Sequence, residues 1–153
     1  MKTIHVLLSI ILLWGCVGCA PAEHPEAKAA AVDAANTWLS LIDSGAFDTS
    51  WDASAAFFKE AVPKDKWIES LTTVRKPLGA NLSRNVKSAK FTTSLKGAPK
   101  GEYVVIQYKS TFSKEKKVIE TVTPMKDKDG IWRVSGYYLK AGRRHWLTEM
   151  MDD

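Results

Sequence analysis

The order of hydrophobic periodicities along the chain predicts an α+β domain, in which three helices precede a four-stranded antiparallel sheet. Up to about residue 75, apolar residues recur every three or four positions, the spacing of a helix that buries one face. From residue 83 onward they alternate at every second position, the spacing of a half-buried strand. Because helices and strands are segregated along the chain, we expect the helices to cover one face of a curved sheet.

Each predicted helix is bounded by residues typical of helix ends. The first ends at Asp43-Ser44-Gly45, where glycine fits a left-handed cap. Side chains of Asp48-Thr49-Ser50 can cap a second helix, and Pro63 fits the first position of a third. The third ends at Lys76-Pro77, because the residue before a proline is pushed out of the helical conformation. The apolar stripes of the three helices are Ala31, Ala34, Ala35, Trp38, Leu41 and Ile42; then Trp51, Ala55, Phe58 and Val62; then Trp67, Leu71 and Val74.

The four strands are predicted at residues 83–95, 103–112, 118–125 and 131–139. The second has the strongest pattern, because its alternate residues Val104, Ile106, Tyr108 and Phe112 are all apolar or aromatic. A hairpin turn with glycine at its end, residues 127–130, separates the last two strands. The core layer between helices and sheet is expected to bury four tryptophans, Trp38, Trp51, Trp67 and Trp132.

The N-terminus is predicted to be an export signal. Residues 6–14 are apolar except for Ser9; this run is too short to span a membrane but has the length of a signal-peptide core. Three processing sites are open: lipoprotein cleavage before Cys19, lipoprotein cleavage before Cys16, or ordinary signal-peptidase cleavage after Ala22. We favour Cys19 as the lipidated residue, since small residues precede it. The protein is therefore expected in the periplasm, with a lipid anchor as its only membrane attachment.

The rest of the chain is expected to fold as one domain. The predicted organisation is a signal peptide at 1–22, a tether at 23–29, one α+β domain at 30–142, and a tail at 143–153 that could form a short helix. The formal net charge is +5, but the lysines are scattered, which favours a solvated surface over a nucleic-acid site. A weak affinity for anionic lipid or cell-wall polymer is the functional alternative.

Several segments of the chain together resemble one protein family. They are residues 38–45, 50–51, 74–79, 83–84, 101–108, 120–123 and 130–138, and the likeness spans about residues 30–140. Taken together, these motifs resemble the bacterial domain-of-unknown-function family numbered 4019. The resemblance implies a small exported bacterial domain shaped like nuclear transport factor 2 (NTF2-like) or like cystatin. It implies no activity, and no catalytic residue is carried over from it.

Residues for several common chemistries are missing from the sequence. No cysteine follows Cys19, and the histidines are only His5, His24 and His145, so no metal site is expected. The chain has no serine-hydrolase motif, no phosphate-binding glycine loop and no dinucleotide fingerprint. We therefore expect no cofactor and assign no catalytic residue.

A set of polar residues on the predicted strands is the remaining candidate site. Glu120 and Arg133 lie within strands, and a charge there is costly to bury unless it is paired. We predict that the Tyr108 hydroxyl, Glu120 and at least one arginine form one hydrogen-bonded group on the concave face. The candidate arginines are Arg133, Arg84 and Arg75, the last of which could instead be a solvated charge at a helix end. Two interpretations stay open: an ion pair on the solvent face, or the polar floor of a ligand pocket.

Two functions are compatible with these features. The first is a non-catalytic module of the bacterial cell envelope that binds a partner protein, a cell-wall or lipid component, or a small ligand. The alternative is an enzyme in which Glu120 acts as acid or base while Tyr108 and Arg133 orient the substrate. A cavity beside Glu120 would favour the enzyme or a ligand pocket, whereas an exposed apolar patch, for which Trp146, Met150 and Met151 are the candidates, would favour the module. The sequence does not identify the partner or the oligomeric state.

Overall fold

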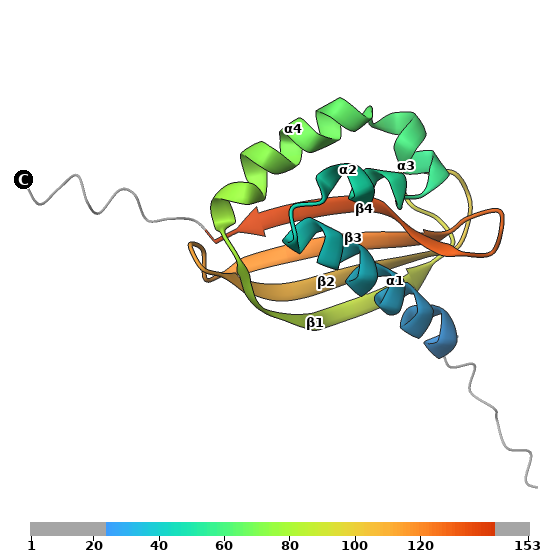
Figure 1. The fold of residues 1–153 in the computed structure, drawn as a ribbon. Coiled ribbons are helices and arrows are strands. Elements are labelled where there is room, and N and C mark those ends of the chain that lie inside the picture. Colours follow the sequence, from blue (N-terminus) through green and yellow to red (C-terminus); the bar gives the residue numbers. More distant parts are fainter. Residues whose placement is uncertain (1–23, 143–153) are drawn as a thin grey trace, which may run out of the picture.

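The computed structural model describes residues 24–142, which fold as four α-helices followed by a four-stranded sheet (Figure 1). The elements are α1 (Pro25–Asp43), α2 (Phe47–Asp52), α3 (Ala56–Ala61), α4 (Lys64–Val74), a 3-10 turn η1 (Lys76–Leu78), β1 (Asn81–Thr92), β2 (Tyr103–Phe112), β3 (Val118–Lys126) and β4 (Trp132–Ala141). Each strand pairs antiparallel with the next, in the order β1-β2-β3-β4. The predicted α+β class and four-stranded antiparallel sheet are confirmed, while the NTF2-like or cystatin-like shape stays a prediction.

The helix count differs from the prediction of three. The segment predicted as the second helix is two short helices, because α2 ends at Asp52 and α3 begins at Ala56. Between them, the extended Ala55 donates its backbone N–H to the Val134 carbonyl on β4 at 2.8 Å. This bond to the sheet replaces the bond that a continuous helix would need. Asp48-Thr49-Ser50 lies inside α2 and does not cap it.

Helix α1 is longer than predicted. It begins at Pro25, so it includes residues 25–29 of the expected tether. Proline fits the first helical turn, and Glu26 places a negative charge where the helix dipole favours one. The predicted left-handed cap at Gly45 is confirmed by its φ of 80°. The predicted signal peptide with Cys19 and the predicted tail at 143–153 lie outside the described residues.

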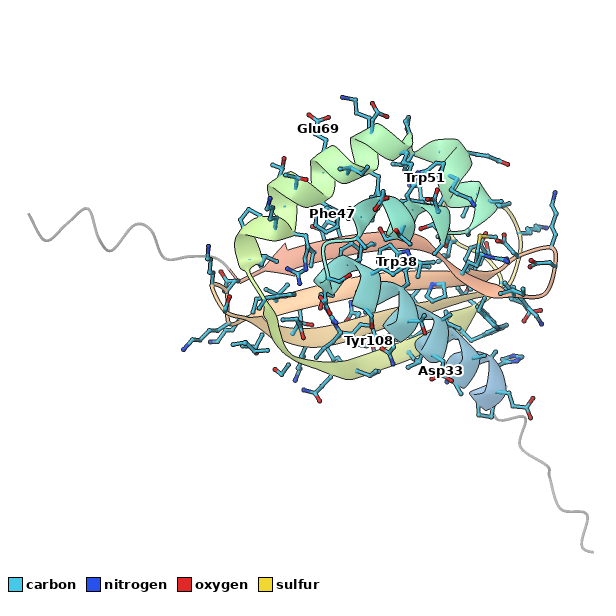
Figure 2. All side chains as sticks on the ribbon, in the orientation of Figure 1. Asp33, Trp38, Phe47, Trp51, Glu69 and Tyr108 are labelled. Carbon is cyan, nitrogen blue, oxygen red and sulfur yellow. The ribbon has the colours of Figure 1, made fainter. Side chains whose placement is uncertain are left out.

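The core lies between the helices and one face of the sheet. Trp38 and Trp67 are buried as predicted, whereas Trp51 and Trp132 are only partly buried. The Trp38 indole N–H donates to the Ser50 carbonyl at 2.8 Å, and Figure 2 shows this side chain between the helices and the sheet. Val74, the last residue of the predicted third stripe, is 52% exposed because α4 ends there.

The sheet has two different faces. On β2, Ile106 and Tyr108 point toward the helices, and alternation places Gln107 and Lys109 on the opposite side. All described helices lie over the first side, and we call the opposite side the outer face (Figure 1). In residues 24–142, no helix has both the length and the apolar character that crossing a membrane requires.

Candidate functional site

A buried carboxylate lies at the centre of the polar residues on the helix-facing side of the sheet. Glu120 on β3 is 0% exposed. Its oxygens accept hydrogen bonds from Arg84 Nε at 2.7 Å, Arg84 Nη2 at 3.2 Å and the Tyr137 hydroxyl at 2.6 Å. The Ser110 hydroxyl on β2 donates a further bond to Oε1. These residues belong to the polar cluster, which we define as Asp43, Arg75, Arg84, Ser110, Glu120 and Tyr137. Arg75, Ser110 and Glu120 are buried, whereas Asp43 lies at the exposed edge of the cluster.

The hydrogen-bonding capacity of Glu120 is fully used. A carboxylate offers about four lone-pair positions. The Glu120 carboxylate accepts four hydrogen bonds, two from Arg84 and one each from Ser110 and Tyr137. A general acid or base needs a position free to exchange a proton with substrate. The geometry therefore leaves Glu120 no free position for acid–base chemistry.

Asp43, the last residue of α1, connects two arginines within the cluster. Its carboxylate accepts from Arg75 Nη2 at 2.8 Å and from Arg84 Nη1 and Nη2 at 2.6 and 3.0 Å. Partial burial acts to raise the pKa of Asp43, but the hydrogen bonds and positive charges of Arg84 and Arg75 outweigh it and hold the pKa below its usual value. The end of α1 is thereby tied to β1 and to the end of α4.

Arg75 is held inside the protein where α4 ends. It is 3% exposed, so it is not the solvated charge at a helix end that the sequence allowed. Its Nη1 donates to the Gly79 carbonyl at 2.8 Å, and its guanidinium carbon lies 4.2 Å from the centre of the Phe112 ring. Gly79 has a φ of 79°, and a Cβ there would lie 2.1 Å from the Ser113 hydroxyl oxygen, so only glycine fits the bend into β1.

The cluster is electrically balanced. Two guanidinium groups, those of Arg75 and Arg84, face the carboxylates of Asp43 and Glu120. Burial acts to lower the pKa of Arg84, but its bonds to Asp43 and Glu120 outweigh burial and raise it. Burial, together with the charge of Glu120, raises the pKa of Tyr137 well above its ordinary value, which keeps its hydroxyl a neutral donor.

Tyr108 lies beside the cluster and is not part of it. It pairs across the strands with Glu120 and faces the helices, as Figure 2 shows beneath α1. Its hydroxyl donates to Asn36 Oδ1 on α1 at 3.0 Å, so the predicted bond to the group around Glu120 is wrong. Burial raises the pKa of Tyr108 to about 12. The tyrosine connects the sheet with the middle of α1.

Arg133 lies at the opposite end of the β3–β4 hairpin, which contradicts its predicted approach to Glu120. It donates to Asp127 Oδ2 at 3.1 Å and to both oxygens of Asp129 at 2.9 and 2.8 Å. The hairpin register explains the separation, because Arg133 pairs with Met125 beside the turn whereas Glu120 pairs with Leu139. Of the predicted arginines, the structure brings only Arg84 and Arg75 into the cluster.

Three members of the cluster were missed by sequence reasoning. Asp43 was assigned only to a helix end, and Ser110 and Tyr137 were not selected. Simple counting from the turn at 127–130 would pair Tyr137 with Thr121, on the opposite face from Glu120. A register shift between Val122 and Pro124 pairs Tyr137 with Val122 instead and brings it to the face of Glu120, and no turn signal in the sequence announces that shift. Nothing local indicates Asp43, because its partners come from distant parts of the chain.

The main hollows of the described residues lie away from the charged side chains of the polar cluster. The three main hollows of residues 24–142 are lined by none of Asp43, Arg75, Arg84, Glu120 or Tyr137. Ser110 lines one of them, but its hydroxyl bonds Glu120 on the helix-facing side while its neighbours Lys109 and Thr111 alternate to the outer face. Within the described residues, no three His, Cys, Asp or Glu side chains gather to hold a metal ion.

The comparison with protein families gives a match that covers about two thirds of the chain. Residues 34–137 match the family described as "Protein of unknown function (DUF4019)". The chain belongs to this family, which confirms the predicted resemblance. Comparison with curated proteins gives no match.

Proposed function

We propose that this member of a family of unknown function is a non-catalytic interaction module of the bacterial cell envelope, and that the outer face of its sheet is the binding surface. The observation that carries the proposal is the contrast between the two faces of the sheet. Side chains of the helix-facing side are packed and paired, whereas the outer face presents unpaired cations to solvent.

The strand register arranges the outer face in rows across the sheet. One row contains Asn85, Lys109, Ile119 and Lys140, and the next contains Ser88, Gln107, Thr121 and Tyr138. Neither row contains a carboxylate. The ammonium groups of Lys109 and Lys140 make no ion pair with any other residue of the described part of the chain. The face therefore keeps a positive charge available to a partner.

Apolar and aromatic groups lie between these cations. Tyr138 is 65% exposed, and Ile119 and Val105 are partly exposed on the same face. Tyrosine is enriched at protein interfaces because its ring adds contact area and its hydroxyl bonds at the wet edge. A surface of this mixed character suits binding better than a uniformly polar face does.

The N-terminal sequence supports placement in the envelope. Its short apolar run at 6–14 has the length of a signal-peptide core, and Cys19 follows at a distance suited to lipidation. We expect the producing cell to remove the residues before Cys19 and to acylate it. Palmitate labelling that is lost in Cys19→Ser but kept in Cys16→Ser supports this placement. A mature N-terminus at Glu23 excludes the lipid anchor, and an intact Met1 on most molecules excludes export.

The enzyme alternative has no supporting observation. It requires Glu120 to exchange a proton with substrate, and this carboxylate is fully buried with all four acceptor positions used. It also requires Arg133 near Glu120, whereas Arg133 lies beside the turn with Asp127 and Asp129.

Site-specific cross-linking in the producing cell tests the proposed surface. A photoreactive phenylalanine analogue at Thr121 probes the middle of the outer face, and the same analogue at Thr72, exposed on α4, is the matched control. We expect a discrete cross-linked product from Thr121 and none from Thr72. Equal labelling from both positions, or labelling from Thr72 alone, would contradict the proposal.

A further inference from the structure

The outer face ends in a hollow of about 550 Å³ beside the turn between β2 and β3. Lys109 and Lys140 flank Ile119 in one row of the sheet and line the hollow from the strands. Lys116 and Lys117 line it from the turn. Its volume lies in the range of small-molecule sites, which is about 300–1,000 Å³. Four lysines from three segments therefore surround one ligand-sized space.

The lining of this hollow offers hydrogen-bond donors and no carboxylate. Ser83 and Thr111 contribute hydroxyls and Asn85 an amide beside the lysines. The Thr111 hydroxyl reaches the Lys116 carbonyl at 3.3 Å, a weak bond that an anion can replace. None of the four ammonium groups has an ion-pair partner in residues 24–142. Glu115, in the same turn, does not line the hollow.

The two other main hollows lack this charge pattern. The larger, of about 920 Å³, lies beside α3 and mixes lysines and Arg133 with Asp52, Glu60, Asp127 and Asp129. The remaining one places Glu102 and Asp127 among its lysines. In the larger hollow, the charge of Arg133 is balanced by its ion pairs with Asp127 and Asp129. A concentrated positive field is thus confined, among the three, to the hollow at the β2–β3 turn.

We propose that this hollow binds the phosphoryl group of an anionic ligand. A phosphoryl group presents several acceptor oxygens with one or two negative charges, and lysine ammonium groups bind it as point charges while hydroxyls donate to its oxygens. The same chemistry is offered by a soluble diphosphate and by the head group of an anionic phospholipid. The inference rests on the proposed function only in using the outer face as the binding surface.

An NMR titration of the full chain isolated from the producing cell tests this inference. The probe is sodium pyrophosphate added at constant ionic strength, with sodium acetate as the control anion. We expect saturable shifts confined to backbone amides around the hollow, such as those of Thr111, Lys117 and Ile119. Acetate should produce no saturable shift, because it carries a single charge and fewer acceptor oxygens. A linear response to pyrophosphate, or shifts spread over the whole outer face, would overturn the inference.

Charge-neutralising variants give the matched control. Lys109→Gln and Lys140→Gln together should weaken pyrophosphate binding by about tenfold or more, since each removes a charge-assisted contact. Lys90→Gln removes the same charge from β1 on the outer face but outside the hollow, and should leave the affinity within about twofold. Equal weakening by Lys90→Gln would show diffuse attraction in place of a site and would overturn the inference.

Vesicles distinguish the source of the phosphoryl group. Flotation with phosphatidylglycerol vesicles that is lost in the Lys109→Gln, Lys140→Gln variant, beside weak pyrophosphate binding, supports a lipid head group. Tight pyrophosphate binding without flotation supports a soluble ligand. The absence of both pyrophosphate binding and flotation would overturn the inference. If Thr121 gives the cross-linked product but the chain binds no phosphoryl group, the inference fails and the proposed function is retained. Phosphoryl binding without any cross-link would instead contradict the protein-binding part of that function.

Discussion

The two faces of one sheet use charged residues in opposite ways. On the helix-facing side, Glu120 is fully buried and Arg84 is partly buried, and the two are paired and hydrogen-bonded at nearly every polar atom. On the outer face, Lys109 and Lys140 are exposed and have no ion-pair partner among the described residues. Both sets lie on neighbouring strand positions, separated only by the thickness of the sheet.

This difference separates the residues that hold the fold from those available to a partner. A buried ion pair left with one member is strongly destabilising, because an uncompensated charge stays inside. Replacing an exposed lysine changes the free energy of unfolding very little, so binding to a partner can determine which residue occupies that position. The comparison therefore predicts large stability effects on one face and small ones on the other.

Removal of the central carboxylate should have the largest effect. Glu120→Ala leaves Arg84, Ser110 and Tyr137 without their shared acceptor. We expect a loss of about 3–5 kcal/mol in the free energy of unfolding, a large part of the 5–15 kcal/mol typical of a domain. Urea unfolding followed by tryptophan fluorescence measures it. A loss no larger than that of Thr121→Ala, on the outer face of the same strand, would show that the cluster is not a structural centre.

Replacement of Asp43 should alter the response to acid. Its pKa is lowered in the folded state, so the unfolded chain takes up a proton first as the pH falls below about 4. The stability that Asp43 contributes is thus present above this pH and is lost as the pH falls toward the folded pKa. Asp43→Asn should therefore be less stable than wild type at neutral pH and should lose less further stability between about pH 4 and pH 2.

Thermal unfolding across this pH range checks the Asp43 prediction. Some acid dependence should remain in the variant, because the pKa of Asp129 is lowered to about 2 by its hydrogen bonds with Arg133 and the backbone of Ile131. Parallel pH curves for wild type and Asp43→Asn would mean that the Asp43 carboxylate is not paired in solution.

Neutralisation of the outer face should have the smallest effect on stability. Lys109→Gln with Lys140→Gln removes two exposed charges that make no described ion pair. We expect the free energy of unfolding to change by less than about 0.5 kcal/mol per substitution. A loss of more than about 2 kcal/mol for the pair, measured in the same urea assay, would place these lysines among the residues that hold the fold.

The sequence identified residues whose signal is local and missed those whose partners lie far along the chain. Periodicity predicted the sheet because each strand carries its own alternation, as Val104 and Ile106 show on β2. The break at Ala55 escaped prediction because its cause is a bond to Val134, far along the chain. The cluster was predicted only in part for the same reason: Glu120 is unusual within its strand, whereas Asp43 becomes a partner only when α1 packs on the sheet.

Arg133 illustrates a different limit. Its residue type and strand position matched those of Arg84, but the hairpin register carries it to the turn, where two aspartates are nearer than Glu120. Two charges on neighbouring strands therefore need not meet. In a hairpin they meet only when they lie at similar numbers of residues from the connecting turn.

The most direct test of the division between the two faces measures binding in a cluster variant. The photoreactive analogue at Thr121 is combined with Glu120→Gln, and cross-linking is measured at a temperature where circular dichroism shows the variant still folded. We predict an unchanged yield of the cross-linked product, because Glu120 supports the fold and lies on the side of the sheet away from the binding surface. A yield that falls severalfold in the folded variant would contradict this division and would make Glu120 part of the functional site.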